Sequence, residues 1–306
     1  MSLSVATVTV AHNERNVLGR QMEALLRQSR PPDEIVIVDN SSTDGTLAFL
    51  ADRYPQVTVL RMSENLGAAG ALAKGLAYAA LEKRYDWILT LDADSTPGDE
   101  VIETLLRGAR SLAHCNGNLG MVAALPFHRE TGACYPPLLW RERFVKPSAE
   151  QLQQPAWFAD LVYSSGCMVR REVIEKIGLP RADFFMDFFD FEFCLRARSH
   201  DYKIAVITGA PLAHEVGKAR RVRLAGWSHL WQSYAPWREY YFSRNITYAV
   251  WWLYPSRRSK RFVARHLARH AAGVALFSSQ KLACLRRMVQ GFWDGRRARL
   301  GVRFLP

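Results

Sequence analysis

Two aspartates at the end of an apolar run constrain this chain more than any other feature. Residues 87–91 are apolar or aromatic except for one threonine, which predicts a buried strand of the kind found in parallel sheets. The run leads directly into Asp92 and Asp94, which point the same way if the strand stays extended. Open α/β sheets bind ligands at this end of their strands. Because two neighbouring carboxylates repel each other, a hard divalent cation is the expected partner, with substrate phosphates as further ligands.

The same residues also have a purely structural interpretation. Asp94 and Ser95 precede Pro97, and acidic or hydroxyl side chains followed by proline commonly begin a helix. A short motif of this kind recurs by chance. The rest of the chain has to decide between a helix cap and a metal site.

Composition predicts an ordinary globular protein. The 306 residues are 49% hydrophobic and 23% charged, enough for one large or two ordinary domains. Five cysteines without metal-binding spacing indicate reduced thiols in a cytosolic protein. The N-terminus resembles a first strand and not a signal peptide, and no apolar run is long enough for a membrane span.

Charge is distributed unevenly along the chain. Residues 215–306 contain 19 Lys and Arg against 3 Asp and Glu, whereas the preceding residues carry a net charge of −4. We therefore expect a domain at 1–215 and a basic, aromatic-rich helical extension at 216–306. Arginines interleaved with aromatic residues are typical of a membrane interface, which predicts a peripheral location on the inner, anionic face of the plasma membrane. A helical subdomain that packs its aromatics inward is the alternative.

Strands alternate with helices through most of the first 215 residues, which predicts a doubly wound, mostly parallel sheet. Helices are expected at 67–85, where small residues allow close packing, and from Pro97 to about residue 114. The stretch 126–160 is irregular and rich in proline, so it is a candidate closing loop. The expected strands are residues 4–11, 34–39, 57–61, 86–92, 121–125 and 203–207.

The second acidic feature is Asp39, which is expected to lie near the pair Asp92 and Asp94. Asp39 ends the second strand as Asp92 ends the fourth, so both lie on one rim of a parallel sheet. The turn at 40–45 offers backbone N–H groups and a helix N-terminus, which suit a nucleotide. Dinucleotide and P-loop glycine fingerprints are absent from the sequence. A simple helix cap is the alternative role for Asp39.

The third acidic feature is a cluster of carboxylates among phenylalanines, at Asp187, Asp190 and Glu192. Unpaired carboxylates are costly to bury, and apolar neighbours would raise the pKa of one of them towards a value useful for a general base. Glu192 could instead pair with Arg196 one helical turn away. That pairing would leave Asp187 and Asp190 unexplained.

The ordered motifs VTVAHNE, IVIVDNSSTDGT, ENLGAAGALAKG, WILTLDADSTP, SSGCMVRREVIEKIG and FFMDFFDFEFCLRA carry a family resemblance. Over residues 4–215 the chain resembles the family 2 glycosyltransferases, inverting sugar-nucleotide enzymes of GT-A fold. It is most similar to the bacterial rhamnosyltransferase and galactofuranosyltransferase branch.

This resemblance implies roles for particular residues. It assigns Asp190 as the catalytic base, with Glu192 beside it. The metal, Mn²⁺ or Mg²⁺, would be held by Asp92, Asp94 and His214. The nucleotide would be bound by Asn13, Asp39, Asn65 and Asp92. The acceptor would be bound by Ser164, Ser165, Gly166 and Asp187.

The implied reaction is a single displacement that moves rhamnose or galactofuranose from a dTDP- or UDP-sugar to a saccharide or lipid-linked glycan during cell-surface polysaccharide synthesis. A polyprenyl-phosphate sugar synthase is the nearest alternative, although a phosphate acceptor needs no general base. A nicotinamide oxidoreductase lacks its glycine fingerprint. A non-enzymatic polyanion-binding protein would leave the acidic rim unexplained, so no nucleic-acid partner is expected. The sequence predicts no oligomeric state.

Overall fold

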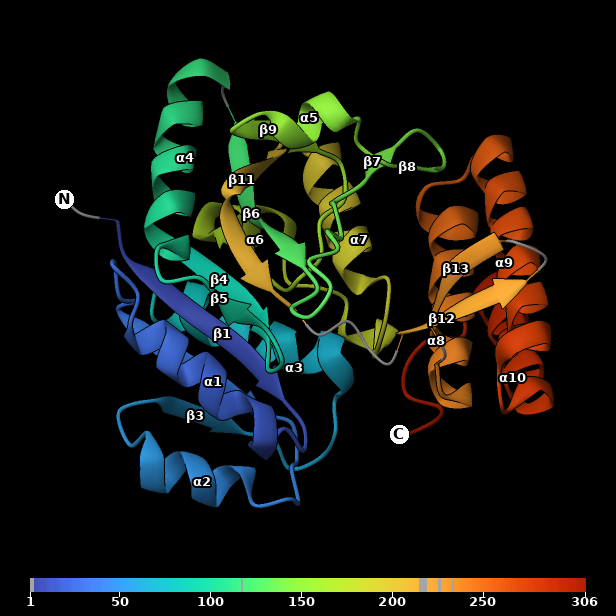
Figure 1. Ribbon diagram of the computed structural model, residues 1–306, viewed down its shortest axis with the longest axis horizontal. Helices are drawn as coiled ribbons and strands as arrows, with labels where there is room; N and C mark the ends of the chain where they lie inside the picture. The colour runs from blue at the N-terminus through green and yellow to red at the C-terminus, as the bar shows by residue number, and fades with distance from the viewer. Residues whose placement is uncertain (1–2, 117, 215–218, 225–226, 233) are drawn as a thin grey trace. The chain divides into compact units, whose positions relative to one another are not determined.

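The computed structural model describes residues 3–116, 118–214, 219–224, 227–232 and 234–306, with side chains in 3–112, 118–214 and 234–306 (Figure 1). The chain forms two compact units. The first contains residues 1–140, 145–182 and 190–215, and the second contains 141–144, 183–189 and 216–306. The boundary expected from the sequence, after residue 215, does not include the two internal segments that join the second unit.

The first unit is built on one sheet in the order β3-β2-β1-β4-β10-β6-β11-β5, with β9 paired to β11. Parallel pairs join β1 to β2 and β4, β2 to β3, and β6 to β11, as the alternation of strands and helices predicts. Strands β5, β9 and β10 run antiparallel to their neighbours, so the sheet is mixed. The strands are β1 (Val5–Ala11), β2 (Glu34–Asp39), β3 (Thr58–Arg61), β4 (Trp87–Asp92), β5 (Thr96–Pro97), β6 (Leu119–Phe127), β9 (Ala156–Ala159), β10 (Cys167–Arg170) and β11 (Lys203–Ala213).

Helices cover both faces of this sheet. Helices α1 (Arg15–Leu26) and α4 (Val101–Asn116) share one apolar core with inward residues of the strands, such as Ile37 and Leu89. On the other face, α3 (Gly67–Leu76) packs closely, because a Cβ at Gly75 would clash with Val8 and Val38. The predicted close approach of this small-residue helix is confirmed.

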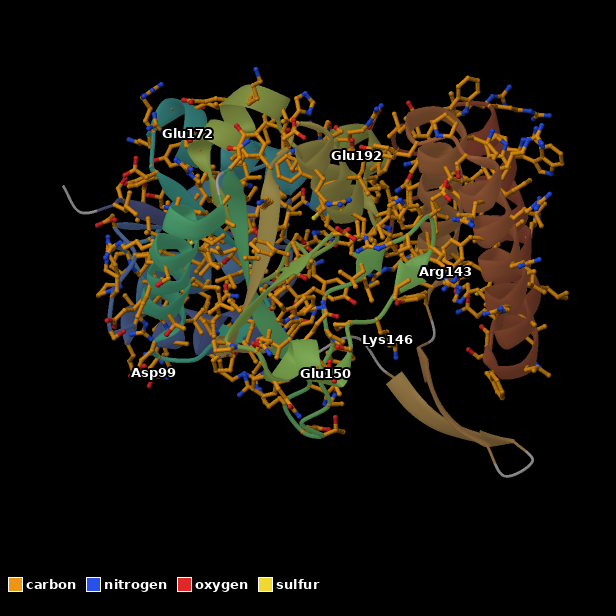
Figure 2. The ribbon with its side chains drawn as sticks, turned by 90° about the horizontal axis from the view of Figure 1, so that it is seen from above. Asp99, Arg143, Lys146, Glu150, Glu172 and Glu192 are labelled. Carbon is orange, nitrogen blue, oxygen red and sulfur yellow. The ribbon has the colours of Figure 1, made fainter. Side chains whose placement is uncertain are left out.

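Two local expectations need correction. Pro97 lies in β5 instead of opening a helix, and α4 begins only at Val101. The helix expected over 67–85 continues past Leu76 as the π-helical turn η1 (Ala77–Glu82). The remaining elements of residues 46–199 are α2 (Thr46–Arg53), β7 (Leu139–Trp140), β8 (Phe144–Val145), α5 (Ala149–Gln153), α6 (Arg171–Ile177), η2 (Ala182–Phe184) and α7 (Phe189–Ser199), and Figure 2 labels Glu192 on α7.

The second unit contains α8 (Pro236–Tyr248), the π-helical turn η3 (Ala249–Leu253), α9 (Arg257–Phe277) and α10 (Lys281–Arg296). Helices α8 and α10 approach closely, because a Cβ at Gly291 or Gly295 would clash with backbone carbonyls of α8. The aromatic side chains Tyr240 and Tyr241 are buried. The inward-packing interpretation therefore holds for these two residues.

The sequence pattern does not predict the antiparallel hairpin of β12 (Ala219–Leu224) and β13 (Trp227–Gln232) that precedes these helices. The side chains of Trp227 and Trp231, which contributed to the membrane prediction, lie outside those described. Among the described residues, no helix has the length and apolar character required to cross a membrane.

Candidate functional site

Strand β4 ends at Asp92, and the chain turns there instead of continuing extended. The backbone N–H of Ser95 donates to the Asp92 carbonyl at 3.0 Å, which closes the turn. Asp94 therefore lies in a turn, and the expected strand alternation is not what orients it. Both carboxylates nevertheless reach the same side chain, because His214 follows the end of β11. The helix-cap interpretation is wrong for this motif, since α4 begins seven residues after Asp94.

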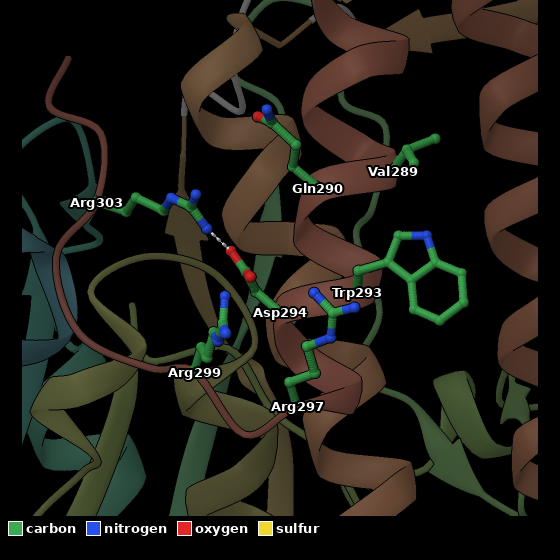
Figure 3. A pocket seen from close by; sticks show the side chains of 7 residues that line it. All are labelled: Val289, Gln290, Trp293, Asp294, Arg297, Arg299 and Arg303. Carbon is green, nitrogen blue, oxygen red and sulfur yellow. Dashed lines mark hydrogen bonds and ion pairs between the residues drawn. The ribbon is translucent and has the colours of Figure 1, made fainter.

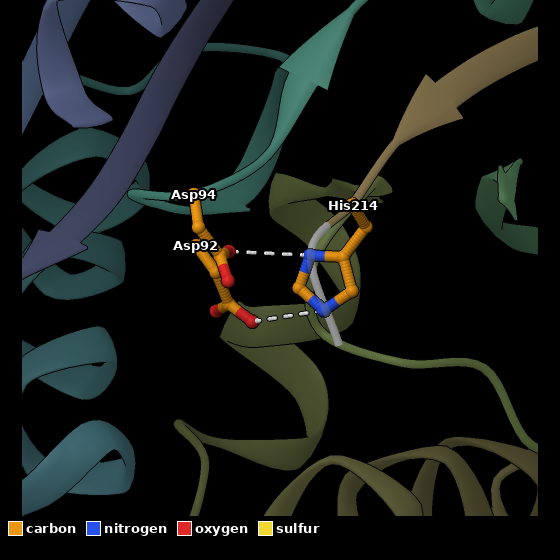
Figure 4. Close-up of side chains that lie close together, drawn as sticks. All are labelled: Asp92, Asp94 and His214. Atoms are coloured by element: carbon orange, nitrogen blue, oxygen red, sulfur yellow. Dashed lines mark ion pairs between the residues drawn. The ribbon is translucent and has the colours of Figure 1, made fainter. Parts of the chain in front are cut away.

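Asp92, Asp94 and His214 form a compact cluster of candidate metal ligands (Figure 4). Each offers one ligand atom, and these atoms lie within 4.8 Å of one another. His214 Nδ1 is 3.2 Å from Asp94 Oδ1, and Nε2 is 4.0 Å from Asp92 Oδ2. Asp94 Oδ1 is buried, and apart from this contact with His214 no described residue donates a hydrogen bond to it. Two carboxylates and one imidazole, with an Asp94 oxygen that lacks a further donor, form a ligand set that fits Mn²⁺ or Mg²⁺.

The side chain of Ser95 connects this cluster to the loop before β10. Its hydroxyl lies 2.7 Å from His214 Nδ1 and 2.6 Å from Ser165 Oγ, and Ser165 Oγ accepts from the Asp92 N–H at 3.1 Å. Ser165 is buried. The structure thus uses Ser165, expected to bind acceptor, to fix the turn that presents Asp92. Because His214 Nδ1 contacts Ser95, the network also orients the imidazole ring.

Gln21 of α1 is a site residue that sequence reasoning missed. Its amide Nε2 donates to the Asp92 carbonyl at 2.6 Å and to the Ser95 carbonyl at 2.8 Å. Its Oε1 accepts from Thr9 at 2.8 Å, and the residue is fully buried. The signal was present, because a glutamine three residues after Leu18 falls on the apolar face of the helix.

Asp39 occupies the same rim of the sheet as Asp92, as predicted. Strand pairing places Ala11 of β1 beside Asp39 and Val10 beside Asp92. Asp39 is fully buried and its Oδ2 accepts from the Ser42 N–H at 3.3 Å, whereas no described residue donates a hydrogen bond to its Oδ1. A buried carboxylate oxygen without a donor fits an N–H group of a ligand.

The other two predicted nucleotide-binding residues organise the loops around Asp39. The side-chain oxygen of Asn13 accepts from the Thr43 N–H at 2.8 Å, and Asn13 itself has a left-handed backbone with φ 59°. The side-chain oxygen of Asn65 accepts from Asn40 and from the Gly67 N–H. Their side chains thus hold the loops after β2 and β3 in place.

Glu14 is a further carboxylate of the site that the sequence reasoning did not select. Its pKa is raised to about 7, first by burial and then by the charges of Asp94, Asp44 and Asp92. The negative charges of Asp92 and Asp94 thus disfavour ionisation of Glu14. A cation bound there would relieve this repulsion.

Asp190 lies in the first turn of α7, which begins at Phe189. Burial raises the pKa of Tyr163 to about 12, and the negative charge of Asp190 contributes to this shift. The ring of Tyr163 also packs on Phe191, with centroids 5.7 Å apart. The loop with Ser164, Ser165 and Gly166 therefore lies close to the carboxylate expected to act as base. Gly166 has φ +82°, and a Cβ there would clash with Leu212.

The carboxylate of Glu192 is bound by Arg196. Both of its oxygens accept from Arg196, at 2.9 and 3.0 Å, so the predicted i, i+4 pair is present. Glu192 is buried, so this pair does not lie on an exposed helix face. Arg196 also donates to the carbonyls of Ile177 and Leu179. These contacts give Glu192 a role in fixing α7.

Asp187 belongs to the second unit, where Arg238 binds its carboxylate through both Nε and Nη2, at 2.8–3.1 Å. Its backbone and those of Phe185 and Phe188 are left-handed, with φ between 58° and 65°. The amide of the buried Asn245 donates to three carbonyls of this segment, at Phe184, Met186 and Asp187. Asp187 was expected to bind acceptor, and in this structure its carboxylate is bound by Arg238.

The fold places the chain in a structural class. It superposes on GalNAc-T7 solved with UDP, GalNAc and Mn²⁺ with a TM-score of 0.62 at 16% identity, covering 96% of this chain and 56% of that one. The TM-score is 0.51 at 13% identity for Staphylococcus aureus TarS 1–349 in complex with UDP, with 97% and 91% of the two chains covered. The first unit has a GT-A fold.

The chain belongs to glycosyl transferase family 2, whose model matches residues 7–178. It is 25% identical to the dTDP-rhamnosyl transferase RfbF of Shigella flexneri over 246 residues, which are 80% of this chain and 79% of that protein. It is 27% identical to the galactofuranosyltransferase GlfT1 of Mycobacterium tuberculosis, over 82% and 83% of the two chains. The predicted family and its rhamnosyl and galactofuranosyl branch are confirmed, and the protein is a glycosyltransferase.

Proposed function

We propose that this glycosyltransferase moves rhamnose or galactofuranose from a dTDP- or UDP-sugar to a hydroxyl group of a saccharide or lipid-linked glycan, with inversion at the anomeric carbon. The observation that carries the proposal is the cluster of Asp92, Asp94 and His214 on the rim that also holds the buried Asp39. Relatives named for dTDP-rhamnose and galactofuranose transfer support the donor class.

Different residues of the site would bind different parts of the donor. Asp39 Oδ1 accepts an N–H of the base, which satisfies an oxygen that otherwise has no donor. Asp92, Asp94 and His214 would hold Mn²⁺ or Mg²⁺, which neutralises charge on the departing nucleoside diphosphate. Ser95 and Gln21 keep the turn and the imidazole in place, so the ligand atoms are positioned before donor arrives.

Asp190 acts on the acceptor. Its carboxylate takes the proton of the acceptor hydroxyl while that oxygen forms a bond to the anomeric carbon and the bond to the diphosphate breaks. The helix dipole favours the charged form of a carboxylate in the first turn of α7. A single displacement of this kind inverts the anomeric centre. Residues 126–160 would close over the donor and exclude water.

The second unit would attach the enzyme to the inner face of the plasma membrane. This part of the proposal rests on the charge of residues 215–306, with 19 basic against 3 acidic residues. An anionic leaflet attracts such a surface by about 1 kcal/mol for each basic residue near it. The first unit would then work on acceptors carried by membrane lipids.

The test compares nucleotide sugars as donors with Mn²⁺ present and with EDTA. The full chain should bind its nucleotide only with the metal, and the product should have the opposite anomeric configuration by NMR. Asp190→Asn should slow transfer by about 10²–10⁴-fold while leaving donor affinity unchanged. The matched control is Asp201→Asn, at an exposed turn position whose φ of 63° asparagine tolerates. Normal transfer by Asp190→Asn would refute the base assignment, and transfer to polyprenyl phosphate alone would favour the synthase alternative.

A further inference from the structure

Helix α10 carries exposed apolar side chains on the side opposite its buried face. One side of the helix is buried through Cys284, Met288 and Gly291. On the opposite side, Leu282 is 85% exposed, Val289 57% and Trp293 47%. The spacing of these three residues, seven and then four, places them in one stripe along the helix. Large apolar side chains in a contiguous stripe normally mark a contact surface.

Only positive charges accompany this stripe. Arg286 falls between Leu282 and Val289 on the same side, and Arg297 follows Trp293 one turn later. The single acidic residue of α10 is Asp294, which is buried and bound by Tyr240 and Arg303. Because no carboxylate balances Arg286 and Arg297 from within α10, the exposed face suits an anionic partner.

The stripe ends at a cationic pocket of about 320 Å³ (Figure 3). Arg297, Arg299 and Arg303 line it together with Trp293 and Asp294. Asp294 already accepts from Tyr240 and Arg303, and Arg297 lies over the Trp293 ring at 5.8 Å. The pocket thus has three guanidinium groups and one carboxylate, which already accepts hydrogen bonds. The remaining guanidinium N–H donors have a planar geometry that matches phosphate.

The sequence of helix α9 also favours an anionic partner. Arg257, Arg261, Arg265 and Arg269 are exposed and follow one another at four-residue intervals, and the helix contains no acidic residue. Like charges at this spacing repel, and basic residues in the first turn oppose the helix dipole. An isolated helix would be more stable without this arrangement. An adjacent anionic surface removes the penalty.

We propose that the exposed face of α10 docks into the headgroup layer of an anionic membrane, with Leu282, Val289 and Trp293 entering the interface and the arginine pocket binding a lipid phosphate. Lipid is favoured over nucleic acid because Leu282 and Val289 gain from an apolar environment and offer no base-stacking surface. The inference specifies the surface for the membrane attachment proposed above. It is independent of the donor sugar.

Point variants of the full chain test the surface. We expect Leu282→Ser with Trp293→Ala to reduce co-sedimentation with phosphatidylcholine vesicles containing roughly 30% phosphatidylglycerol by at least about tenfold. Leu81→Ser is the matched control, because Leu81 is 43% exposed but lies in the first unit. An equal loss in the control, or no loss in the α10 variant, would overturn the assignment to α10.

The pocket is tested separately. Arg297→Gln with Arg299→Gln should remove most of the preference for phosphatidylglycerol vesicles over pure phosphatidylcholine vesicles. An unchanged preference would overturn the phosphate site. Full displacement of the protein from vesicles by a single-stranded oligonucleotide would overturn the choice of lipid. UDP titration with Mn²⁺ on the same variants reports on the first unit, so failure of the proposed sugar transfer is seen apart from failure of docking.

Discussion

The substitution Gln21→Met tests whether α1 holds the metal-site turn. Methionine has a similar volume and is well accepted in a core, so the change removes hydrogen bonds with little change in packing. Three bonds are lost, from Thr9 and to the carbonyls of Asp92 and Ser95. The Asp92 carbonyl keeps the Ser95 N–H as a donor, whereas the Ser95 carbonyl and the Thr9 hydroxyl lose the bonds described here.

The expected loss of stability follows from these contacts. At about 0.5–1.5 kcal/mol for each hydrogen bond, the variant should lose about 1.5–4.5 kcal/mol. For a unit of this size, that corresponds to a fall in Tm of roughly 5–15 °C. Because the turn presents both aspartates, Mn²⁺-dependent affinity for UDP should fall by about 10–100-fold.

Calorimetry and isothermal titration on the full chain measure the two effects. Gln153→Met is the matched control, since Gln153 is exposed on α5 and should change neither quantity. If Gln21→Met keeps the wild-type Tm and UDP affinity, the amide does not support the site and the reasoning fails. A lower Tm with unchanged UDP affinity would show that the bonds stabilise the core without positioning Asp92.

Three further predictions concern other parts of the site and its support. Ser95→Ala should weaken Mn²⁺ binding by about 10–100-fold, measured by metal titration with UDP present, because His214 loses its hydrogen-bond partner; equal binding would contradict this. In metal-free protein, Glu14 has a raised pKa near 7, so stability should fall as pH rises from 4.5 to 7 and then stay level. Glu14→Gln should abolish that fall in a Tm-against-pH series, and an unchanged slope would argue against it. Asn245→Ala should destabilise the second unit by about 3 kcal/mol in urea unfolding, because three carbonyls lose a donor; a Thr58→Ala control in the first unit should leave that transition unchanged.

The sequence was sufficient for the parts of the fold that repeat a pattern. Apolar runs ending in aspartate placed Asp39 and Asp92 on one rim, because parallel register brings strand ends together. The antiparallel strand β10 has only four residues, and no local pattern states which neighbours it pairs with. Pairing partners of short strands depend on contacts distant in sequence, which propensity does not encode.

The same distinction applies to the site. Asp92 and Asp94 were found from a local motif, whereas Gln21 and Ser95 act through hydrogen bonds to residues seventy or more positions away. Glu192 was placed beside the base by the family resemblance. Its pairing with Arg196 could be predicted from helical spacing, but not its burial, which depends on how α7 packs.

Helix α8 of the second unit supports the segment 183–189, which precedes Asp190 in the chain. Arg244 is fully buried and donates to the carbonyls of Asp183, Phe184 and Gly301, while Asn245 holds the residues that follow. Residues 183–189 thus obtain their hydrogen bonds from α8, although they immediately precede Asp190 in the chain. Truncation after His214 would remove those donors and leave three left-handed residues without support. Such a truncation should therefore impair sugar transfer even in the absence of membranes, which is why point variants on the exposed face of α10, and not deletion, separate docking from catalysis.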